Sequence, residues 1–348
     1  MNKLTCEHCG EHFIAVRRDA RFCTNKCRLK AKRQSRLVEQ LAPPEKFRPG
    51  DSYLGDFDNY LAALGHTVTP QMVLRGQAKA ANAPHRLQRE TVEAVCRYPR
   101  VAVRSAHNLG KTYLIALLGT WWLLRKRDNL VLVASAKESQ VSNLVLSLAA
   151  QYCGQLFGPR SSASVGTRFI YPDRRRSPRW AMHSLSGLRP EAFASYHAVG
   201  DGALLVIIDE CSALLSPLAY AVEGIASGHN CHVLYLGNPL GSALGGPFHS
   251  AFREDSGWHC LHWATQRHPN IEHDRPIYPA GISYDWLERC ASLWGWDSDE
   301  FQARCLGEWP KRMQSKEGSD WFITPESIGK MHGMSREEVI QWLAPLLT

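Results

Sequence analysis

A loop from Ser105 to Thr112 holds residue types that can bind the phosphates of a nucleotide. It ends in Gly-Lys-Thr, between an apolar strand pattern at 101–104 and an apolar helix pattern at 113–124. In such a loop, backbone N–H groups cradle the phosphates, a lysine reaches the β- and γ-phosphates, and a hydroxyl binds Mg²⁺. Lys111 and Thr112 are assigned the last two roles. The residues expected around the phosphates are Ser105, Ala106, His107, Asn108, Leu109, Gly110, Lys111 and Thr112.

The loop begins with Ser105 where the usual pattern has glycine, so by itself it could be an ordinary turn. Two adjacent carboxylates further along the chain strengthen the interpretation as a phosphate-binding loop. Asp209 and Glu210 follow an apolar strand pattern at 203–208. An acid at the end of a strand can hold Mg²⁺, and the next carboxylate can orient and deprotonate a water. Asp209 is assigned the first role and Glu210 the second. An Asp-Glu pair after a strand can also cap a helix.

A third strand pattern, 232–236, leads into Gly237-Asn238-Pro239. This places the Asn238 amide as a candidate sensor of the terminal phosphate. A Gly-Asn-Pro sequence is equally suited to a simple turn.

Four cysteines near the start of the chain have the spacing of a metal site: Cys6, Cys9, Cys23 and Cys27. Two tight turns could present four thiolates at the corners of a tetrahedron, which favours Zn²⁺. So short a segment cannot build an apolar core, so the metal would supply its folding free energy. Unrelated thiols, an iron–sulfur cluster, or a ligand exchanged for His8 or His12 are the alternatives.

The net charge of +8 has its source in one segment. Residues 17–36 contain nine Lys and Arg against the single acid Asp19, and the remainder of the chain is balanced. Such a run would neutralise phosphates without reading base sequence, so the predicted partner of this segment is a nucleic acid, DNA or RNA. A solvated helix face, or counter-charge for a zinc–thiolate centre, would use the same residues. Prolines and glycine at 43–50 predict a linker.

The 348 residues and 44% hydrophobic content indicate a folded chain of about two domains. No apolar run approaches the ~18 residues of a membrane span, and residues 1–10 lack a signal-peptide core, so no membrane partner and a cytoplasmic location are expected. The seven remaining cysteines lie mostly in apolar contexts and indicate buried thiols.

Taken together and in order, the motifs from about Pro84 to Pro310 resemble the ATPase domain of the large terminase subunit, the DNA-packaging motor of tailed phages and prophages. The stretch 21–28 resembles a knuckle of small zinc ribbons. The motifs that carry the likeness are Gln88-Arg89-Glu90, Val101–Thr112, Ser135–Val141, Arg189–His197, Gly237-Asn238-Pro239, Gly246-Pro247-Phe248 and Leu306–Pro310.

The resemblance implies ATP as the nucleotide, with Gln88 on adenine and Asn238 coupling nucleotide state to movement. It also implies an arginine from a neighbouring subunit, for which Arg189 is the candidate and Arg174–Arg176 and Arg179 are rivals. Many terminases carry a further arginine inside the loop. Ala106 occupies that place here, which leaves open whether Arg104 or His107 compensates.

The predicted fold is an α/β P-loop NTPase of the ASCE type with a mostly parallel central sheet, preceded by a small zinc ribbon. The expected boundaries are 1–36 for the basic zinc finger, 37–84 for a linker and helical adaptor or lid, 85–312 for the ATPase domain, and 313–348 for a tail with a docking helix. The resemblance further implies a homo-oligomeric motor that meets a portal and a small terminase subunit.

The residues after Pro310 are too few for a terminase nuclease, so no nuclease activity is expected in this chain. The nuclease is expected to be a separately encoded partner or to be missing, as in a split or truncated terminase. A helicase-like translocase, or a DNA-binding adaptor that does not hydrolyse ATP, would use the same parts.

Overall fold

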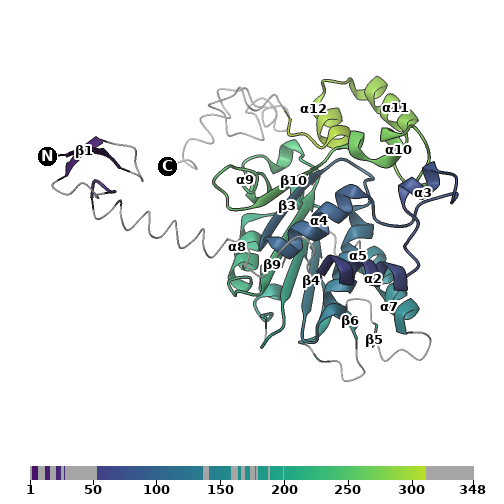
Figure 1. The fold of residues 1–348 in the computed structure, drawn as a ribbon, viewed down its shortest axis with the longest axis horizontal. Coiled ribbons are helices and arrows are strands. Elements are labelled where there is room, and N and C mark those ends of the chain that lie inside the picture. Colours follow the sequence, from purple (N-terminus) through teal and green to yellow (C-terminus); the bar gives the residue numbers. More distant parts are fainter. Residues whose placement is uncertain are drawn as a thin grey trace, which may run out of the picture. The chain divides into compact units, whose positions relative to one another are not determined.

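The computed structural model describes most of the chain between residues 53 and 310 and short pieces before it (Figure 1). The described residues are 2–6, 12–15, 21–24, 27, 53–135, 141–157, 164–165, 169–172, 177, 179–186, 189–198 and 200–310. The chain divides into two units, Met1–Trp309 and Pro310–Thr348. The predicted docking helix at 335–347 and most of the basic segment at 17–36 lie outside the described residues.

One eight-stranded sheet organises the first unit, in the order β10-β3-β9-β8-β4-β7-β6-β5. The six strands from β10 to β7 run parallel, and β6 and β5 pair antiparallel at one edge. The mostly parallel sheet predicted from the sequence is therefore confirmed. The strands are β3 (Arg100–Ser105), β4 (Leu130–Ser135), β5 (Ser164–Val165), β6 (Phe169–Tyr171), β7 (Ala181–Ser186), β8 (Leu204–Ile208), β9 (Cys231–Gly237) and β10 (His259–Trp263).

The strand order also fixes the type of P-loop fold. Strand β3 precedes the Gly-Lys-Thr loop and strand β8 precedes the two acids. In the sheet, β9 lies between β3 and β8. An additional strand between these two is the feature that defines the ASCE type, so this part of the prediction is confirmed as well.

Helices cover both faces of the sheet because successive strand residues point to opposite sides. On one face, Val101, Val103, Ile207 and their neighbours join a core with α2, α4, α5, α7 and α11. On the other face, Ala102, Val206 and their neighbours join a core with α8 and α9. These helices are α2 (Tyr53–Ala63), α4 (Arg86–Arg97), α5 (Lys111–Arg125), α7 (Ser147–Phe157), α8 (Ser216–Ile225), α9 (Pro247–Ser250) and α11 (Tyr284–Trp294).

Helix α5 is the most deeply buried of them. Leu114–Leu123 are all buried, as expected for a helix that is apolar on every side. The region expected as a helical adaptor contains α2 and a short helix, α3 (Pro70–Leu74). Phe57 of α2 packs edge-on against Trp121 of α5, with ring centroids 5.2 Å apart, so α2 belongs to the same core.

Short helical turns complete the structure: α10 (Pro269–Glu272), α12 (Asp299–Phe301), π-helices η1 (Val141–Leu146) and η6 (Gln302–Leu306), and 3₁₀ turns η2 (Pro190–Phe193), η3 (Cys211–Ala213), η4 (Gly241–Ala243) and η5 (Thr265–Arg267). Near the N-terminus, β1 (Asn2–Thr5) and β2 (His12–Ala15) pair antiparallel. Among the described residues, no helix combines the length and hydropathy needed to cross a bilayer.

Gly237, the last residue of β9, has no room for a side chain. A Cβ there would stand 2.9 Å from the Cys211 amide nitrogen and 3.2 Å from both the Ser212 nitrogen and the Phe248 ring. Because two of these atoms are backbone, we expect Gly237→Ala to lower the free energy of unfolding by about 1–3 kcal/mol, measured by urea denaturation. Gly241→Ala, with nothing within 4 Å of its Cβ, is the matched control. Equal stabilities for the two variants would contradict this packing.

Candidate active site

The residues predicted to bind the nucleotide or act on it follow the carboxyl ends of three parallel strands, β3, β8 and β9. Arg104 of β3 pairs with Gly237 of β9, and Ile208 of β8 pairs with Tyr235 of β9. The residues that follow these strands therefore come close together. The Asn238 amide donates a hydrogen bond of 2.6 Å to the Ser105 carbonyl, which joins the end of β9 to the start of the loop.

The loop between β3 and α5 has the backbone shape of an anion cradle. Asn108 and Gly110 both have positive φ (54° and 78°), and Gly110 is the N-cap of α5. A glycine N-cap offers no side chain to the first-turn N–H groups, which leaves them suited to a ligand anion. The Lys111 ammonium folds back over the loop and donates to the Ala106 carbonyl at 3.2 Å. Thr112 follows on the first turn of α5 and is partly buried.

Ser105 fits the place of the usual glycine without strain. It is the last residue of β3, is fully buried, and is not among the described residues with positive φ. Its hydroxyl donates to the Ala106 carbonyl at 2.8 Å. The departure from the usual pattern is therefore compatible with a phosphate-binding loop.

Lys111, Asp209 and Glu210 form an electrostatic group. Burial lowers the pKa of Lys111, and the carboxylates of Asp209 and Glu210 act in the opposite direction. Burial raises the pKa of Asp209, while Lys111 and the Glu210 N–H, which donates to Asp209 Oδ1 at 2.9 Å, oppose that rise. The ammonium and the two carboxylates therefore influence one another's protonation. The structure thus brings together the three residues that carry most of the predicted chemistry.

Glu210 is held in a rarely occupied backbone conformation. Its φ of 54° lies in the left-handed region, which costs a non-glycine residue about 1–3 kcal/mol. The turn is fixed by Asp209, whose N–H donates to the Ala134 carbonyl of β4, and by η3, which begins at Cys211 and packs on Gly237. Strain of this kind persists where the surrounding structure imposes it, which is common at catalytic sites.

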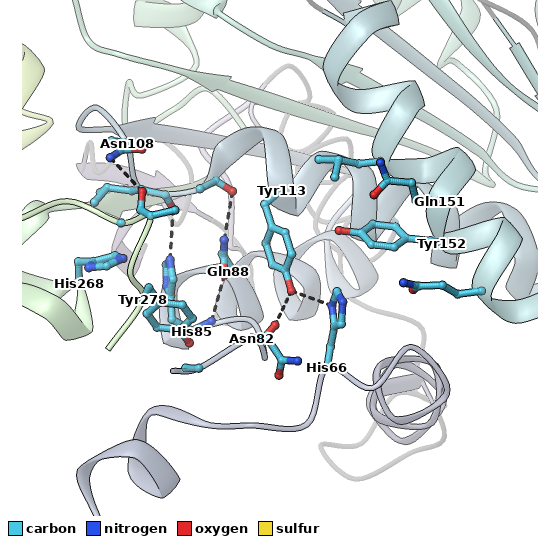
Figure 2. Close-up of a pocket in the computed structure, with 17 residues that line it drawn as sticks. His66, Asn82, His85, Gln88, Asn108, Tyr113, Gln151, Tyr152, His268 and Tyr278 are labelled. Atoms are coloured by element: carbon cyan, nitrogen blue, oxygen red, sulfur yellow. Dashed lines mark hydrogen bonds between the residues drawn. The ribbon is translucent and has the colours of Figure 1, made fainter. Parts of the chain in front are cut away.

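A cavity of about 420 Å³ opens beside the loop (Figure 2). None of the described residues that line it is Asp, Glu, Lys or Arg; the walls are aromatic rings, leucines, amides, histidines and small residues. Apolar walls with a few oriented polar groups suit a nucleobase and its sugar better than phosphates. The lining residues are His66, Ala81, Asn82, His85, Gln88, Asn108, Leu109, Gly110, Tyr113, Leu148, Gln151, Tyr152, Gln155, His268, Tyr278, Ala280 and Gly281.

Gln88, predicted to contact adenine, lines this cavity and connects α4 to the loop. Its Oε1 accepts from the His85 N–H at 3.0 Å, and its Nε2 donates to the Gly110 carbonyl at 3.1 Å. A primary amide has a second N–H and a second lone pair, so both ends keep capacity for a ligand.

Most residues of the cavity wall belong to no motif in the sequence and were not predicted to form a binding site. Tyr113 extends from α5 and contacts two earlier segments, donating to the Asn82 carbonyl at 2.7 Å and lying 2.9 Å from His66 Nδ1 (Figure 2). Tyr278 donates to the Ala83 carbonyl at 2.7 Å. Only the position of Tyr113 directly after Gly-Lys-Thr offered a signal; the other residues meet through long-range packing.

The arginine candidates lie in different environments. Arg189 is exposed at the start of η2, and Arg179 is also exposed. Arg174–Arg176 lie outside the described residues. Arg104 is engaged elsewhere, because its guanidinium forms an ion pair with Glu308 and donates to the Gly307 carbonyl at 3.3 Å.

His107 makes its contacts with Arg304, a residue that the sequence did not single out. Arg304 Nη1 donates to His107 Nε2 at 3.0 Å, and the His107 N–H donates to the Arg304 carbonyl at 2.8 Å. Burial, with Lys111 and Arg304 adding to it, lowers the pKa of His107 to about 4. The imidazole is therefore neutral near pH 7 and can accept the arginine's hydrogen bond.

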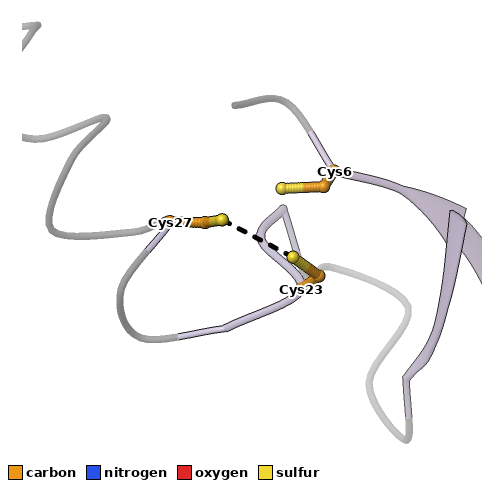
Figure 3. A group of neighbouring side chains, drawn as sticks. All are labelled: Cys6, Cys23 and Cys27. Atoms are coloured by element: carbon orange, nitrogen blue, oxygen red, sulfur yellow. Dashed lines mark hydrogen bonds between the residues drawn. The ribbon is translucent and has the colours of Figure 1, made fainter. Parts of the chain in front are cut away.

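Three of the four predicted metal ligands converge near the N-terminus. The Sγ atoms of Cys6, Cys23 and Cys27 all lie within 4.8 Å of one another, and those of Cys23 and Cys27 are 3.6 Å apart (Figure 3). Cys9 and His8 lie outside the described residues. His12 Nδ1 lies 3.0 Å from the Thr5 hydroxyl. Three thiols without a disulfide are a donor set that suits Zn²⁺.

Comparisons with known proteins return structural neighbours alone. The P74-26 Thermus phage large terminase ATPase domain is 14% identical, with a TM-score of 0.49 over 76% of this chain and 100% of that one. The large terminase of bacteriophage HK97 is 14% identical, with a TM-score of 0.47 over 65% of this chain and 50% of that one. Both are large terminases, the family that the sequence motifs resemble.

The UvsW helicase of bacteriophage T4 also matches, at 13% identity and a TM-score of 0.39 over 67% of this chain and 76% of that one. No protein-family model and no curated protein sequence matches the chain.

The buried histidines of the cavity predict acid sensitivity. Burial lowers the pKa of His268 to about 4 and, together with His268, lowers that of His85 to about 3. In the unfolded chain both would titrate near pH 6.5, so the unfolded state binds more protons between pH 6.5 and 4. The free energy of unfolding therefore falls as the pH is lowered through this range, by up to about 1.4 kcal/mol per pH unit for each histidine.

His268→Asn keeps an acceptor for the Asn270 N–H and removes one titrating group, so we expect a shallower dependence in urea denaturation at several pH values. His273→Asn, an exposed position after the same short helix, is the control. A wild-type slope in His268→Asn would contradict the assignment.

Proposed function

We propose that this chain hydrolyses ATP and uses the cycle to move double-stranded DNA, as the motor of a phage-type DNA-packaging machine. The observation that supports this most is the convergence of Lys111, Asp209 and Glu210 around a loop with two positive-φ residues, at the exit of β3 and β8 with β9 between them. The uncharged cavity beside the loop suits a nucleoside.

The residues fit MgATP in separate roles. Thr112 and Asp209 would hold Mg²⁺, which when bound neutralises charge on the phosphates. The α5 N-terminus and Lys111 would bind the phosphates, and Gln88 and Tyr113 would face the nucleoside.

Hydrolysis would proceed by in-line displacement at the γ-phosphorus. Glu210 accepts a proton from the attacking water, whose oxygen forms a bond to phosphorus. The bond from phosphorus to the β–γ bridging oxygen breaks, and its electron pair stays on ADP. Asn238, bonded to the Ser105 carbonyl, would report the change in the phosphates to β9.

The remaining partners rest on the sequence resemblance. We propose a zinc ion on Cys6, Cys9, Cys23 and Cys27, DNA contacts from the basic residues at 17–36, and a homo-oligomeric assembly in the host cytoplasm. The portal, the small terminase subunit and a separately encoded nuclease are proposed as its partners, and Arg189 as an arginine offered to a neighbouring subunit.

Replacing Glu210 tests the reaction. We expect Glu210→Gln to lower the ATP turnover rate at least about 10²-fold while ATP still binds, because the amide cannot accept the water's proton. Steady-state hydrolysis, with and without double-stranded DNA, measures this. Glu288→Gln on the exposed side of α11 is the control. Turnover at the wild-type rate in Glu210→Gln would contradict the assignment of Glu210 as the base. Separation of the strands of a forked duplex by the wild-type chain would favour a helicase instead.

Removing thiolates tests the metal and the DNA interaction together. We expect Cys23→Ser/Cys27→Ser to lose the zinc counted by native mass spectrometry, because two ligands cannot hold the site. The dependence of DNA affinity on salt should then become shallower, by about 0.9 in slope for each phosphate that the protein no longer neutralises. Cys260→Ser, an exposed free cysteine, is the control. Retained zinc would contradict the metal site, and an unchanged slope in the zinc-free variant would assign DNA binding to another part of the chain.

A further inference from the structure

We propose that the Arg304 guanidinium contacts the phosphates of ATP bound to the same chain, and that His107 positions this guanidinium. This rests on the proposed ATP hydrolysis.

Arg304 contacts the loop directly. The guanidinium of Arg304 donates to His107 Nε2 at 3.0 Å, and the backbones of the same two residues are joined by a hydrogen bond of 2.8 Å. Lys111 lies close enough to His107 to lower its pKa. The Lys111 ammonium donates to the Ala106 carbonyl, in the peptide that precedes His107, at 3.2 Å, so Arg304 and Lys111 contact the same part of the loop.

The charges around Arg304 favour the binding of an anion. Among the described residues no carboxylate forms an ion pair with Arg304, whereas Arg100, Arg104 and Arg267 pair with Glu223, Glu308 and Glu90. Arg304 is partly buried, and a second cation, Lys111, lies on the same loop. Two neighbouring cations, one of them without a described carboxylate, form a site that an anion would stabilise.

The backbone that carries Arg304 is held rigidly against the loop. Arg304 lies on η6, and the residues after it are fastened to the base of the loop. Gly307 has a φ of 68°, and a Cβ there would stand 2.9 Å from the Ala106 nitrogen and 3.0 Å from the Trp263 carbonyl oxygen. The Ala106 N–H donates to that same carbonyl. Electrostatic catalysis depends on such preorganisation, and single π-helical turns are frequent at functional sites.

In the reaction written above, negative charge grows on the γ-phosphate oxygens and on the bridging oxygen that leaves with ADP. A planar guanidinium placed at these oxygens stabilises the transition state more than the bound nucleotide. Arg304 takes no proton and forms no bond.

Arg304→Ala tests this directly. We expect kcat to fall at least about 10²-fold while the Kd for ADP stays at the wild-type value. The tighter binding of ADP with aluminium fluoride, which mimics the transferring phosphoryl group, should be lost, and added guanidinium should restore part of the rate. Arg289→Ala, an exposed arginine on α11, is the control.

His107 needs a readout of its own. His107→Gln keeps an acceptor for the guanidinium and should retain most of kcat, whereas His107→Leu removes it and should lower kcat with little change in KM. Equal kcat for the two His107 variants would remove its positioning role.

The failures are distinguishable. If Lys111→Ala abolishes hydrolysis while Arg304→Ala keeps the wild-type kcat, the proposed function stands and Arg304 is not the arginine. If Arg304→Ala loses ADP binding and thermal stability along with kcat, its role is structural and the proposal is overturned. A wild-type chain that binds ADP but hydrolyses no ATP, alone, with DNA or as an oligomer, would contradict the proposed function and this inference together.

Discussion

The parallel pairing of β3, β9 and β8 is the constraint on which the rest of the structure depends. Because parallel strands end at the same edge, this pairing brings the loop after Ser105, the amide of Asn238 and the acids at 209–210 to one place. The register is held by the two cores, since a slip of one residue would turn each strand's apolar side chains to the opposite face. In another register, the lysine and the carboxylates would no longer follow strand ends that lie side by side.

Close backbone contacts then convert the shared edge into a site of defined geometry. Gly237 allows the turn after Glu210 to pack on β9, and Gly307 allows the segment after η6 to pack beneath the loop. Both contacts involve backbone atoms, which do not move aside as a flexible side chain would. The strained backbone of Glu210 and the Arg304–His107 contact are consequences of this packing.

The sequence predicts the residues that belong to local patterns. The strand–loop–helix around Lys111 and the apolar strand before Asp209 are contiguous, so their periodicity and end residues can be read directly. Lys111 and the two acids, which lie far apart in the sequence, influence one another electrostatically, which an unrelated Gly-Lys-Thr turn would not require.

Contacts between distant segments could not be predicted in this way. The cavity joins residues from His66 to Gly281, and Arg304 reaches the loop from the far end of the described chain. Sequence periodicity does not predict the contact between Arg304 and the loop, because this contact results from the pairing of β10 with β3 and from the turn at Gly307. Arg104, a sequence candidate for the missing arginine, is used instead in an ion pair with Glu308.

Equilibrium binding of MgATPγS, a slowly hydrolysed analogue, to the full chain tests the central claim that this edge is a nucleotide site. We expect one analogue to bind per chain by calorimetry. Its affinity should be lowered at least about 10-fold, or about 1.4 kcal/mol, in Lys111→Ala and unchanged in Lys126→Ala at the exposed end of α5. Equal affinity in wild type and Lys111→Ala, or no binding to either, would contradict it.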